Sequence, residues 1–207
     1  MFYIFIMDHN NILPVVLAGG KSKRFGDEKS QVKLGGKILI DYILGEIIDD
    51  FNEVLIVANT SIQHLNSDKI IKIEDYKKNL GPLGGIYSAM RWIKNNNKKY
   101  QWIASFPSDT PFFKRTILND FLNRINEKES ELFFMKSREK RHNIFGLWSV
   151  DLVDQLDKDL ETGTRKVERW ANDIGVKTIN MNFEKTDPFF NINTKEDLEF
   201  AKKNLND

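Results

Sequence analysis

The sequence predicts a single α/β domain built on a mostly parallel β-sheet with helices on both faces. Three observations support this fold class. Short apolar runs alternate with amphipathic helical patterns through most of the chain, which is typical of parallel strands joined by crossover helices. The chain of 207 residues is long enough to bury a large core without disulfides. It contains no internal repeat, low-complexity segment or linker that would divide it into two domains.

The predicted strands are short, apolar and rich in β-branched residues, as expected for buried strands. They span residues 12–18, 54–58, 70–73, 102–106, 131–135, 144–148 and 176–181. The predicted helices place apolar side chains three and four positions apart. They span residues 38–48, 86–93, 117–125, 152–160 and 166–174. A final helix through Asn204 is expected after Thr194, because Thr-Lys-Glu-Asp is a helix-capping pattern.

Composition and charge narrow the classes of function. The formal net charge of +1 argues against a general nucleic-acid binder, which would usually carry a strongly basic face. The absence of cysteine excludes disulfides, thiolate nucleophiles and cysteine-rich zinc sites, and it is compatible with the cytoplasmic location that we expect. No apolar run approaches the roughly 20 residues that span a bilayer, so we expect no membrane partner.

The N-terminal residues 1–7 are apolar, but they lack the basic region and the small-residue cleavage site of a signal peptide. We therefore expect residues 1–11 to form a loose extension and residues 12–207 to form the domain. The extension is assigned no function on sequence grounds.

A glycine-rich cationic loop follows the first predicted strand. Gly19 and Gly20 carry no Cβ atom, so the backbone can turn sharply and approach another group closely. The cations that follow are Lys21, Lys23, Arg24 and Lys29. Backbone N–H groups and cationic side chains together bind phosphates, so the loop is predicted to do so rather than to be a solvated basic loop. The spacing excludes a Walker A loop, which needs a glycine where Val15 stands, and a dinucleotide fingerprint, because Gly-x-Gly does not occur.

Three polar side chains follow other predicted strands. Asn59, Asp75 and Asp109 stand just past strand ends, so they are expected to share one crevice with the glycine loop at the carboxyl edge of the sheet. Prolines on both sides should hold Asp109 in a rigid, extended segment. A rigid carboxylate there suits Mg²⁺, which takes one or two carboxylates and leaves other positions to phosphates and water. The alternative is that Asp109 caps the helix that follows it.

Two further segments carry candidate binding residues. Residues 81–85, Gly-Pro-Leu-Gly-Gly, form a turn into a helix N-terminus that can accept a ribose or a phosphate. Asn191 and Asn193 adjoin the last predicted helix, where on their own they are better explained as turn residues that bond to local backbone. The histidines lack ligand spacing on a helix and Gly-x-Ser-x-Gly is absent, so neither a histidine metal site nor a serine nucleophile is expected.

In combination, these segments resemble the molybdenum cofactor guanylyltransferase family of the nucleotidyltransferase superfamily. The resemblance extends from Val15 to about residue 202 and includes Phe-Gly-Leu-Trp at 145–148. Its selective segments are Gly-Pro-Leu-Gly-Gly, Pro-Ser-Asp-Thr-Pro and Asn-Ile-Asn-Thr in this order. The broader superfamily signature is Leu-Ala-Gly-Gly at 17–20, then Arg-Phe-Gly at 24–26, then Lys29. The resemblance implies a Rossmann-like domain of the nucleotide-diphospho-sugar transferase type.

The resemblance implies transfer of GMP from GTP to the terminal phosphate of molybdopterin or its metal-bearing form, the molybdenum cofactor, with Mg²⁺ as cofactor and pyrophosphate as product. The implied nucleotide-binding residues are Leu17, Ala18, Gly19, Gly20, Lys29, Asn59, Asp75, Gly81 and Asp109. The implied catalytic residues are Arg24, Lys29 and Asp109, of which Asp109 would also bind the metal. The implied acceptor-binding residues are Asn191 and Asn193.

The sequence departs from the family pattern at three points. Glu28 stands where aspartate is usual, residues 30–33 are more polar than usual, and His142 is followed by asparagine where a proline commonly stands. Two other functions remain open: a cytidylyltransferase acting on molybdopterin or on a sugar or polyol phosphate, and a non-catalytic nucleotide-binding regulator. By resemblance, a molybdenum-insertion protein or a target oxidoreductase is the expected protein partner.

Overall fold

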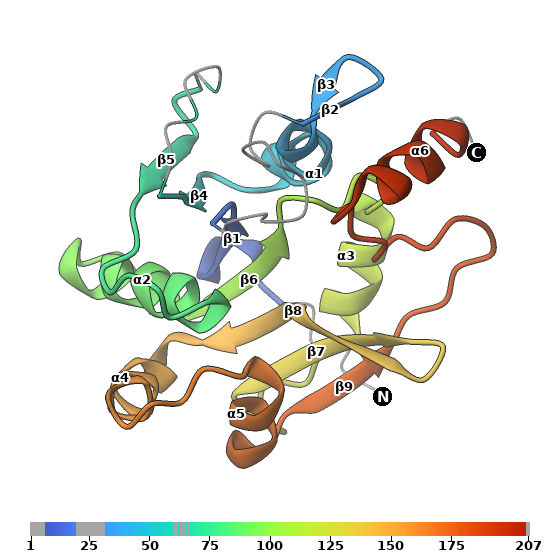
Figure 1. Ribbon diagram of the computed structural model, residues 1–207. Helices are drawn as coiled ribbons and strands as arrows, with labels where there is room; N and C mark the ends of the chain where they lie inside the picture. Colours follow the sequence, from blue (N-terminus) through green and yellow to red (C-terminus); the bar gives the residue numbers. More distant parts are fainter. Residues whose placement is uncertain (1–6, 20–31, 60–61, 63–64, 66, 206–207) are drawn as a thin grey trace.

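The computed structural model describes residues 7–19, 32–59, 62, 65 and 67–205, and these residues form the predicted α/β domain (Figure 1). Their main sheet has seven strands in the order β5-β4-β1-β6-β8-β7-β9. The strands are β1 (Ile12–Leu17), β4 (Val54–Val57), β5 (Ile70–Ile73), β6 (Trp102–Pro107), β7 (Leu132–Ser137), β8 (Lys140–Ser149) and β9 (Lys177–Asn180). β1, β4, β5 and β6 pair in parallel, β8 is antiparallel to β6 and β7, and β9 is parallel to β7. The prediction of a mostly parallel sheet is confirmed.

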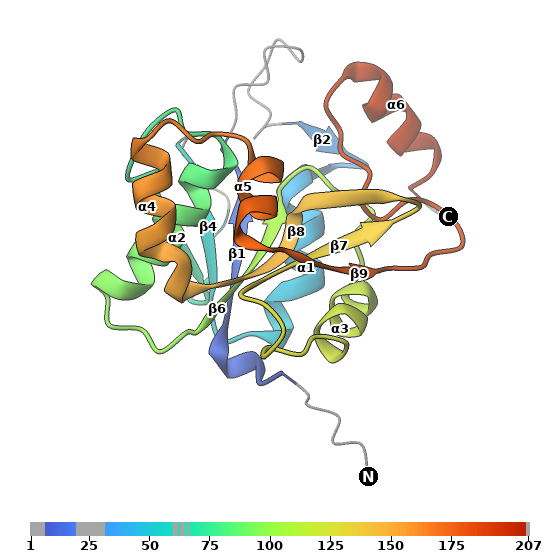
Figure 2. The same cartoon turned by 90° about the horizontal axis from the view of Figure 1, so that it is seen from below.

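Helices cover both faces of the sheet, as predicted (Figure 2). They are α1 (Leu39–Ile47), α2 (Pro82–Asn95), α3 (Arg115–Asn123), α4 (Val153–Glu161), α5 (Val167–Ile174) and α6 (Lys195–Lys203). Side chains of α1 and α3 pack in one core with Ile12 and Val16 of β1. Side chains of α2, α4 and α5 pack in a second core with Leu13 and Val15 of the same strand. Successive side chains of a strand point to opposite faces, so the apolar run of β1 supplies both cores.

The helix α6 packs on a small third cluster. This cluster joins Val32, Leu34, Phe112 and Ile192 to Ala201 of α6. Leu34 belongs to a short hairpin, β2 (Lys33–Leu34) and β3 (Lys37–Ile38), which the sequence does not predict because two-residue strands leave no apolar period. None of the helices in the described part of the chain is long and apolar enough to cross a membrane.

Residues 7–11, which belong to the expected extension over residues 1–11, pack against the domain. Met7 is buried in the first core, and the ring of His9 stacks on Phe51 with 5.3 Å between centroids. The carbonyl of Asn11 accepts a hydrogen bond from the N–H of Gln101 at 2.9 Å. Residues 1–6 lie outside the described residues.

Residues 136–143, which lie between two of the predicted strands, belong mostly to strands. β7 extends to Ser137 and β8 begins at Lys140, so the turn consists of Arg138 and Glu139. Both turn residues have positive φ angles, 43° and 64°, and this local geometry lets the antiparallel ladder continue almost to the tip. The polar composition of the segment therefore marks an exposed hairpin end rather than a long loop.

The Phe-Gly-Leu-Trp segment of β8 contributes to both cores, and its Trp148 packs in the second. Trp148 Nε1 donates to Ser105 Oγ at 2.6 Å, and the Trp148 ring meets those of Phe134 and Trp170 at centroid distances of 4.9 and 5.9 Å. A Cβ atom on Gly146 would overlap the Phe134 ring and the neighbouring backbone. The glycine is required here by close approach of the aromatic ring.

His142 of β8 joins the hairpin to the C-terminal segment. Its ring stacks on Phe189 at 3.9 Å between centroids, and its Nε2 lies 2.7 Å from Ser137 Oγ. Burial lowers the pKa of His142 from 6.5 to about 4; Asp187 opposes this shift and Lys140 adds to it. The neutral imidazole is therefore part of the packing that holds the segment leading to Asn191.

The substitution Gly146→Ala is expected to lower the free energy of unfolding by about 2–3 kcal/mol, because the added methyl group overpacks the core. Urea denaturation measures the change. Gly45→Ala is the matched control, since a Cβ atom there meets nothing within 4 Å and alanine favours the helix α1. Equal stability of the two variants would contradict the crowding at Gly146.

Acidification between pH 6.5 and 4 is expected to destabilise the protein through His142. The unfolded chain binds a proton there as the pH falls through 6.5, whereas the folded chain resists protonation until about pH 4. His142→Gln should therefore flatten the fall of the urea midpoint over this range. An unchanged slope for His142→Gln would show that the folded imidazole titrates normally.

Candidate functional site

The carboxyl ends of four parallel strands lie in register at one edge of the sheet. Leu17, the last residue of β1, pairs with the last residues of β4 and β6, and the last residue of β4 pairs with that of β5. Each strand is followed two residues later by a predicted site residue, and these are Gly19, Asn59, Asp75 and Asp109. These four residues therefore lie at one edge of the sheet, and the crevice that they are expected to share stays a prediction.

Asn59 and Asp75 form a reciprocal pair beyond β4 and β5. Asn59 Nδ2 donates to Asp75 Oδ2 at 2.7 Å, and the backbone N–H of Asp75 donates to Asn59 Oδ1 at 3.3 Å. These two hydrogen bonds fix the orientation of the Asn59 amide plane and of the Asp75 carboxylate. The pair thus presents one oriented acid and one oriented amide at the edge of the sheet.

Two glycines lie beside this pair, Gly19 after β1 and Gly85 in α2. A Cβ atom on Gly19 would lie 3.7 Å from Asn59 Nδ2. One on Gly85 would lie 2.8 Å from Leu17 Cδ2 and 3.8 Å from Asp75 Oδ1. Gly85 therefore lies beside the pair, although only Gly81 of the Gly-Pro-Leu-Gly-Gly segment is expected to bind the nucleotide.

Asp109 pairs with Asn191 of the C-terminal segment. Asn191 Nδ2 donates to Asp109 Oδ1 at 2.7 Å, and the N–H of Ile192 donates to the Asp109 carbonyl at 3.0 Å. The helix that follows, α3, has Lys114 as its N-terminal cap residue and no side-chain cap bond. The alternative that Asp109 caps this helix is therefore wrong. Its carboxylate faces a residue 82 positions away in the sequence.

The two amide–carboxylate pairs lie on either side of the end of β1. Sheet order places β4 and β5 on one side of β1 and β6 on the other. The N–H of Ser108 donates to the carbonyl of Leu17 at 3.2 Å, which ties the Asp109 segment to the end of β1. Gly19 follows Leu17 and so lies between the Asn59–Asp75 pair and the Asp109–Asn191 pair.

Asn193 behaves differently from Asn191. Its N–H donates to Asp197 Oδ2 at 2.8 Å, next to the predicted capping box in which Thr194 Oγ1 accepts from the N–H of Asp197. The backbone of Asn193 therefore bonds locally, as expected of a turn residue. The side chain of Asn191 instead bonds to Asp109.

Gly20, Arg24 and Lys29 lie outside the described residues. The residues that flank residues 20–31 are both at the candidate site. Gly19 lies beside Asn59, and Val32 packs in one cluster with Phe112 and Ile192, which adjoin the Asp109 and Asn191 segments.

Gly81 is the N-cap residue of α2 and has a positive φ of 65°. Asp75 and Gly81 lie near the two ends of the segment between β5 and α2. Within the described residues, no three histidine, aspartate or glutamate side chains form a group that could hold a metal ion by themselves.

Comparison with known proteins identifies close relatives in sequence and fold. A molybdenum cofactor guanylyltransferase from Nitrobacter hamburgensis is 28% identical over 192 residues, which is 91% of this chain and 92% of the relative. One from Rhizobium rhizogenes is 29% identical over 206 residues, 96% of this chain and 94% of the relative. The solved structure of molybdopterin-guanine dinucleotide biosynthesis protein A from Archaeoglobus fulgidus shares the fold, with a TM-score of 0.75 at 24% identity over 93% of this chain and 97% of that one.

A family model spans most of the structure described above. The model of the MobA-like NTP transferase domain matches residues 14–175, from β1 through α5. The matched range includes the register of strand ends, both residues of the Asn59–Asp75 pair and Asp109. The protein belongs to the family of MobA-like NTP transferase domains.

Proposed function

We propose that this protein transfers GMP from GTP to molybdopterin or its metal-bearing form and releases pyrophosphate. The relatives named above support this reaction by their names. The observation that carries the proposal is the pairing of Asp109 with Asn191 beside the end of β1, opposite the Asn59–Asp75 pair. One edge of the sheet thus offers two separate polar sites, as a reaction between a nucleotide and a second phosphorylated substrate requires.

The nucleotide would occupy the side of β4 and β5. The oriented pair of Asn59 and Asp75 supplies an amide and a carboxylate, which suit a base edge and ribose hydroxyls. The segment of Leu17, Ala18 and Gly19 would approach the nucleotide with its backbone, because Gly19 has no side chain to obstruct contact. Gly20, the next residue in the chain, would extend this approach toward the phosphates.

The phosphates and the acceptor would meet on the side of β6. Asp109 and Asn191 provide a carboxylate and an amide oxygen, which are hard oxygen donors of the kind that Mg²⁺ takes together with phosphate oxygens. Bound there, Mg²⁺ would offset negative charge on the triphosphate. Asn191 would orient the Asp109 carboxylate through their hydrogen bond, and Asn193 would lie toward the acceptor.

The remaining chemistry is alignment and charge neutralisation. The attacking group is the terminal phosphate of the acceptor, which is already anionic and needs no general base. Arg24 and Lys29 would neutralise the leaving pyrophosphate, which is where negative charge develops. Catalysis by this set of residues requires neither a histidine nor a cysteine.

In the presence of Mg²⁺ and molybdopterin, the protein is expected to release pyrophosphate from GTP. Release from CTP, UTP or ATP should be at least about 100-fold slower, because a wrong base leaves polar groups of the site unpaired. A coupled pyrophosphate assay measures this. Selectivity for CTP would instead identify a cytidylyltransferase. Absence of release with all four nucleotides, together with a thermal shift by GTP, would identify a binding protein without turnover.

The substitution Asp109→Asn is expected to lower kcat at least about 100-fold, because the site loses the negative charge that would hold the metal and triphosphate. The melting temperature should stay close to that of the wild type, since asparagine fills the same volume. Asp173→Asn removes an exposed carboxylate from α5 and should leave kcat unchanged. Near-wild-type turnover of Asp109→Asn would remove Asp109 from the site.

A further inference from the structure

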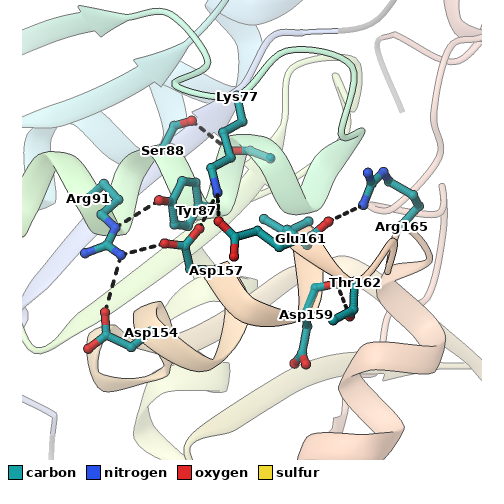
Figure 3. A network of polar contacts seen from close by, with 12 residues as sticks. Lys77, Tyr87, Ser88, Arg91, Asp154, Asp157, Asp159, Glu161, Thr162 and Arg165 are labelled. Atoms are coloured by element: carbon teal, nitrogen blue, oxygen red, sulfur yellow. Dashed lines mark hydrogen bonds and ion pairs between the residues drawn. The ribbon is translucent and has the colours of Figure 1, made fainter.

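Residues 74–81, between β5 and α2, carry two of the proposed nucleotide-binding residues. Asp75 lies near one end of this segment and Gly81 at the other, with Lys77 between them. The side chain of Lys77 leaves the segment and reaches α4, a helix from the second half of the chain (Figure 3). The segment is therefore connected to a part of the fold that contains none of the proposed site residues.

Lys77 is held by side chains of two helices. Its Nζ donates to Asp157 Oδ1 at 2.5 Å and to Glu161 Oε1 at 3.2 Å, both on α4. The ammonium group also lies 5.2 Å from the centre of the Tyr87 ring of α2, within cation–π range. These contacts define the place of Lys77 relative to both helices.

Asp157 is shared between Lys77 and Arg91 of α2. Its Oδ2 accepts from Arg91 at 2.8 Å, and Arg91 Nε donates to the Tyr87 hydroxyl at 3.0 Å (Figure 3). Hydrogen bonds from Lys77 and Arg91 lower the pKa of Asp157 to about 2, so this carboxylate is ionised near neutral pH. Arg91 thus joins α4 to α2, and Lys77 joins α4 to the segment.

The backbone between Lys77 and Asp75 is also restrained. The N–H of Tyr76 donates to Ser88 Oγ at 2.9 Å, and Ser88 Oγ donates to the carbonyl of Gly84 at 2.7 Å. Only Tyr76, whose backbone N–H is bound in this way, separates Lys77 from Asp75.

The Lys77–Asp157 contact contributes little to global stability. The two side chains are 36% and 22% exposed, and ion pairs with this exposure add little to the free energy of unfolding. Its effect is local, because it determines how a site-bearing segment lies on the domain. We propose that Lys77 is a positioning residue: its contact with Asp157 holds residues 74–81 so that Asp75 and Gly81 meet the nucleotide.

This inference rests on the proposed function, since it takes Asp75 as a nucleotide contact. It adds a residue that acts through Asp75 and Gly81 without touching the nucleotide. The expected signature is therefore a change in nucleotide affinity with little change in the chemical step.

Lys77→Met keeps the length of the side chain and removes its charge. The dissociation constant and the KM for GTP are expected to rise about fivefold, and kcat to stay within roughly twofold. Lys77→Arg keeps the cation and should restore the wild-type KM. Calorimetric titration with GTP and Mg²⁺ and steady-state pyrophosphate release give the two readouts.

Arg91→Met is the matched control, because it removes the other cation from the same carboxylate without touching residues 74–81. It should lower the melting temperature by about as much as Lys77→Met and leave the affinity for GTP unchanged. The inference is overturned if Lys77→Met binds GTP normally, or if Arg91→Met weakens binding equally.

Asp75→Ala distinguishes the inference from the proposed function. If the wild type binds GTP and Asp75→Ala weakens binding while Lys77→Met does not, the positioning role alone is wrong. If the wild type binds none of the four nucleoside triphosphates, the proposed function and the positioning role fail together.

Discussion

The parallel pairing of β1 with β4 on one side and β6 on the other is the constraint on which the candidate site depends. Because Leu17 pairs with the last residue of each neighbour, the chain leaves all of these strands at the same height. A shift by one residue would turn the buried side chains of β1 to the wrong face, so two cores oppose it. Hydrophobic burial in the sheet thereby sets the relative positions of polar groups beyond it.

The polar groups at this edge keep their orientation because each carboxylate has an amide partner. Asp75 is held by Asn59, which comes from the neighbouring strand, and Asp109 is held by Asn191, which comes from the C-terminal segment. A carboxylate with a fixed hydrogen bond loses less freedom when a ligand arrives, so the ligand need not supply that ordering. The stacking of Phe189 on His142 brings the Asn191 segment back across the hairpin.

The sequence predicts the fold and one half of the site well, for identifiable reasons. Asn59, Asp75 and Asp109 each follow an apolar run, and the alternation of strands and helices implies that these runs end at the same edge. The partner of Asp109 could not be predicted from residue patterns, because 82 residues separate it from Asn191 and nothing local marks the contact. The same holds for Lys77 and Asp157, since charged surface residues show no period. The packing of residues 7–11 could not be predicted, because Met7 stands apart from the apolar run of β1 and continues no strand or helix periodicity.

The pairing of Asp109 with Asn191 also has a consequence for synthesis of the chain on the ribosome. Gly19, Asn59, Asp75 and Asp109, and the strands that they follow, are all synthesised within the first 109 positions. Asn191 is translated 82 residues later. A nascent chain can therefore assemble the nucleotide side of the edge well before the other side is complete. A product that terminates prematurely after α5 would retain every strand end of the parallel set, yet it would lack the residue that orients Asp109.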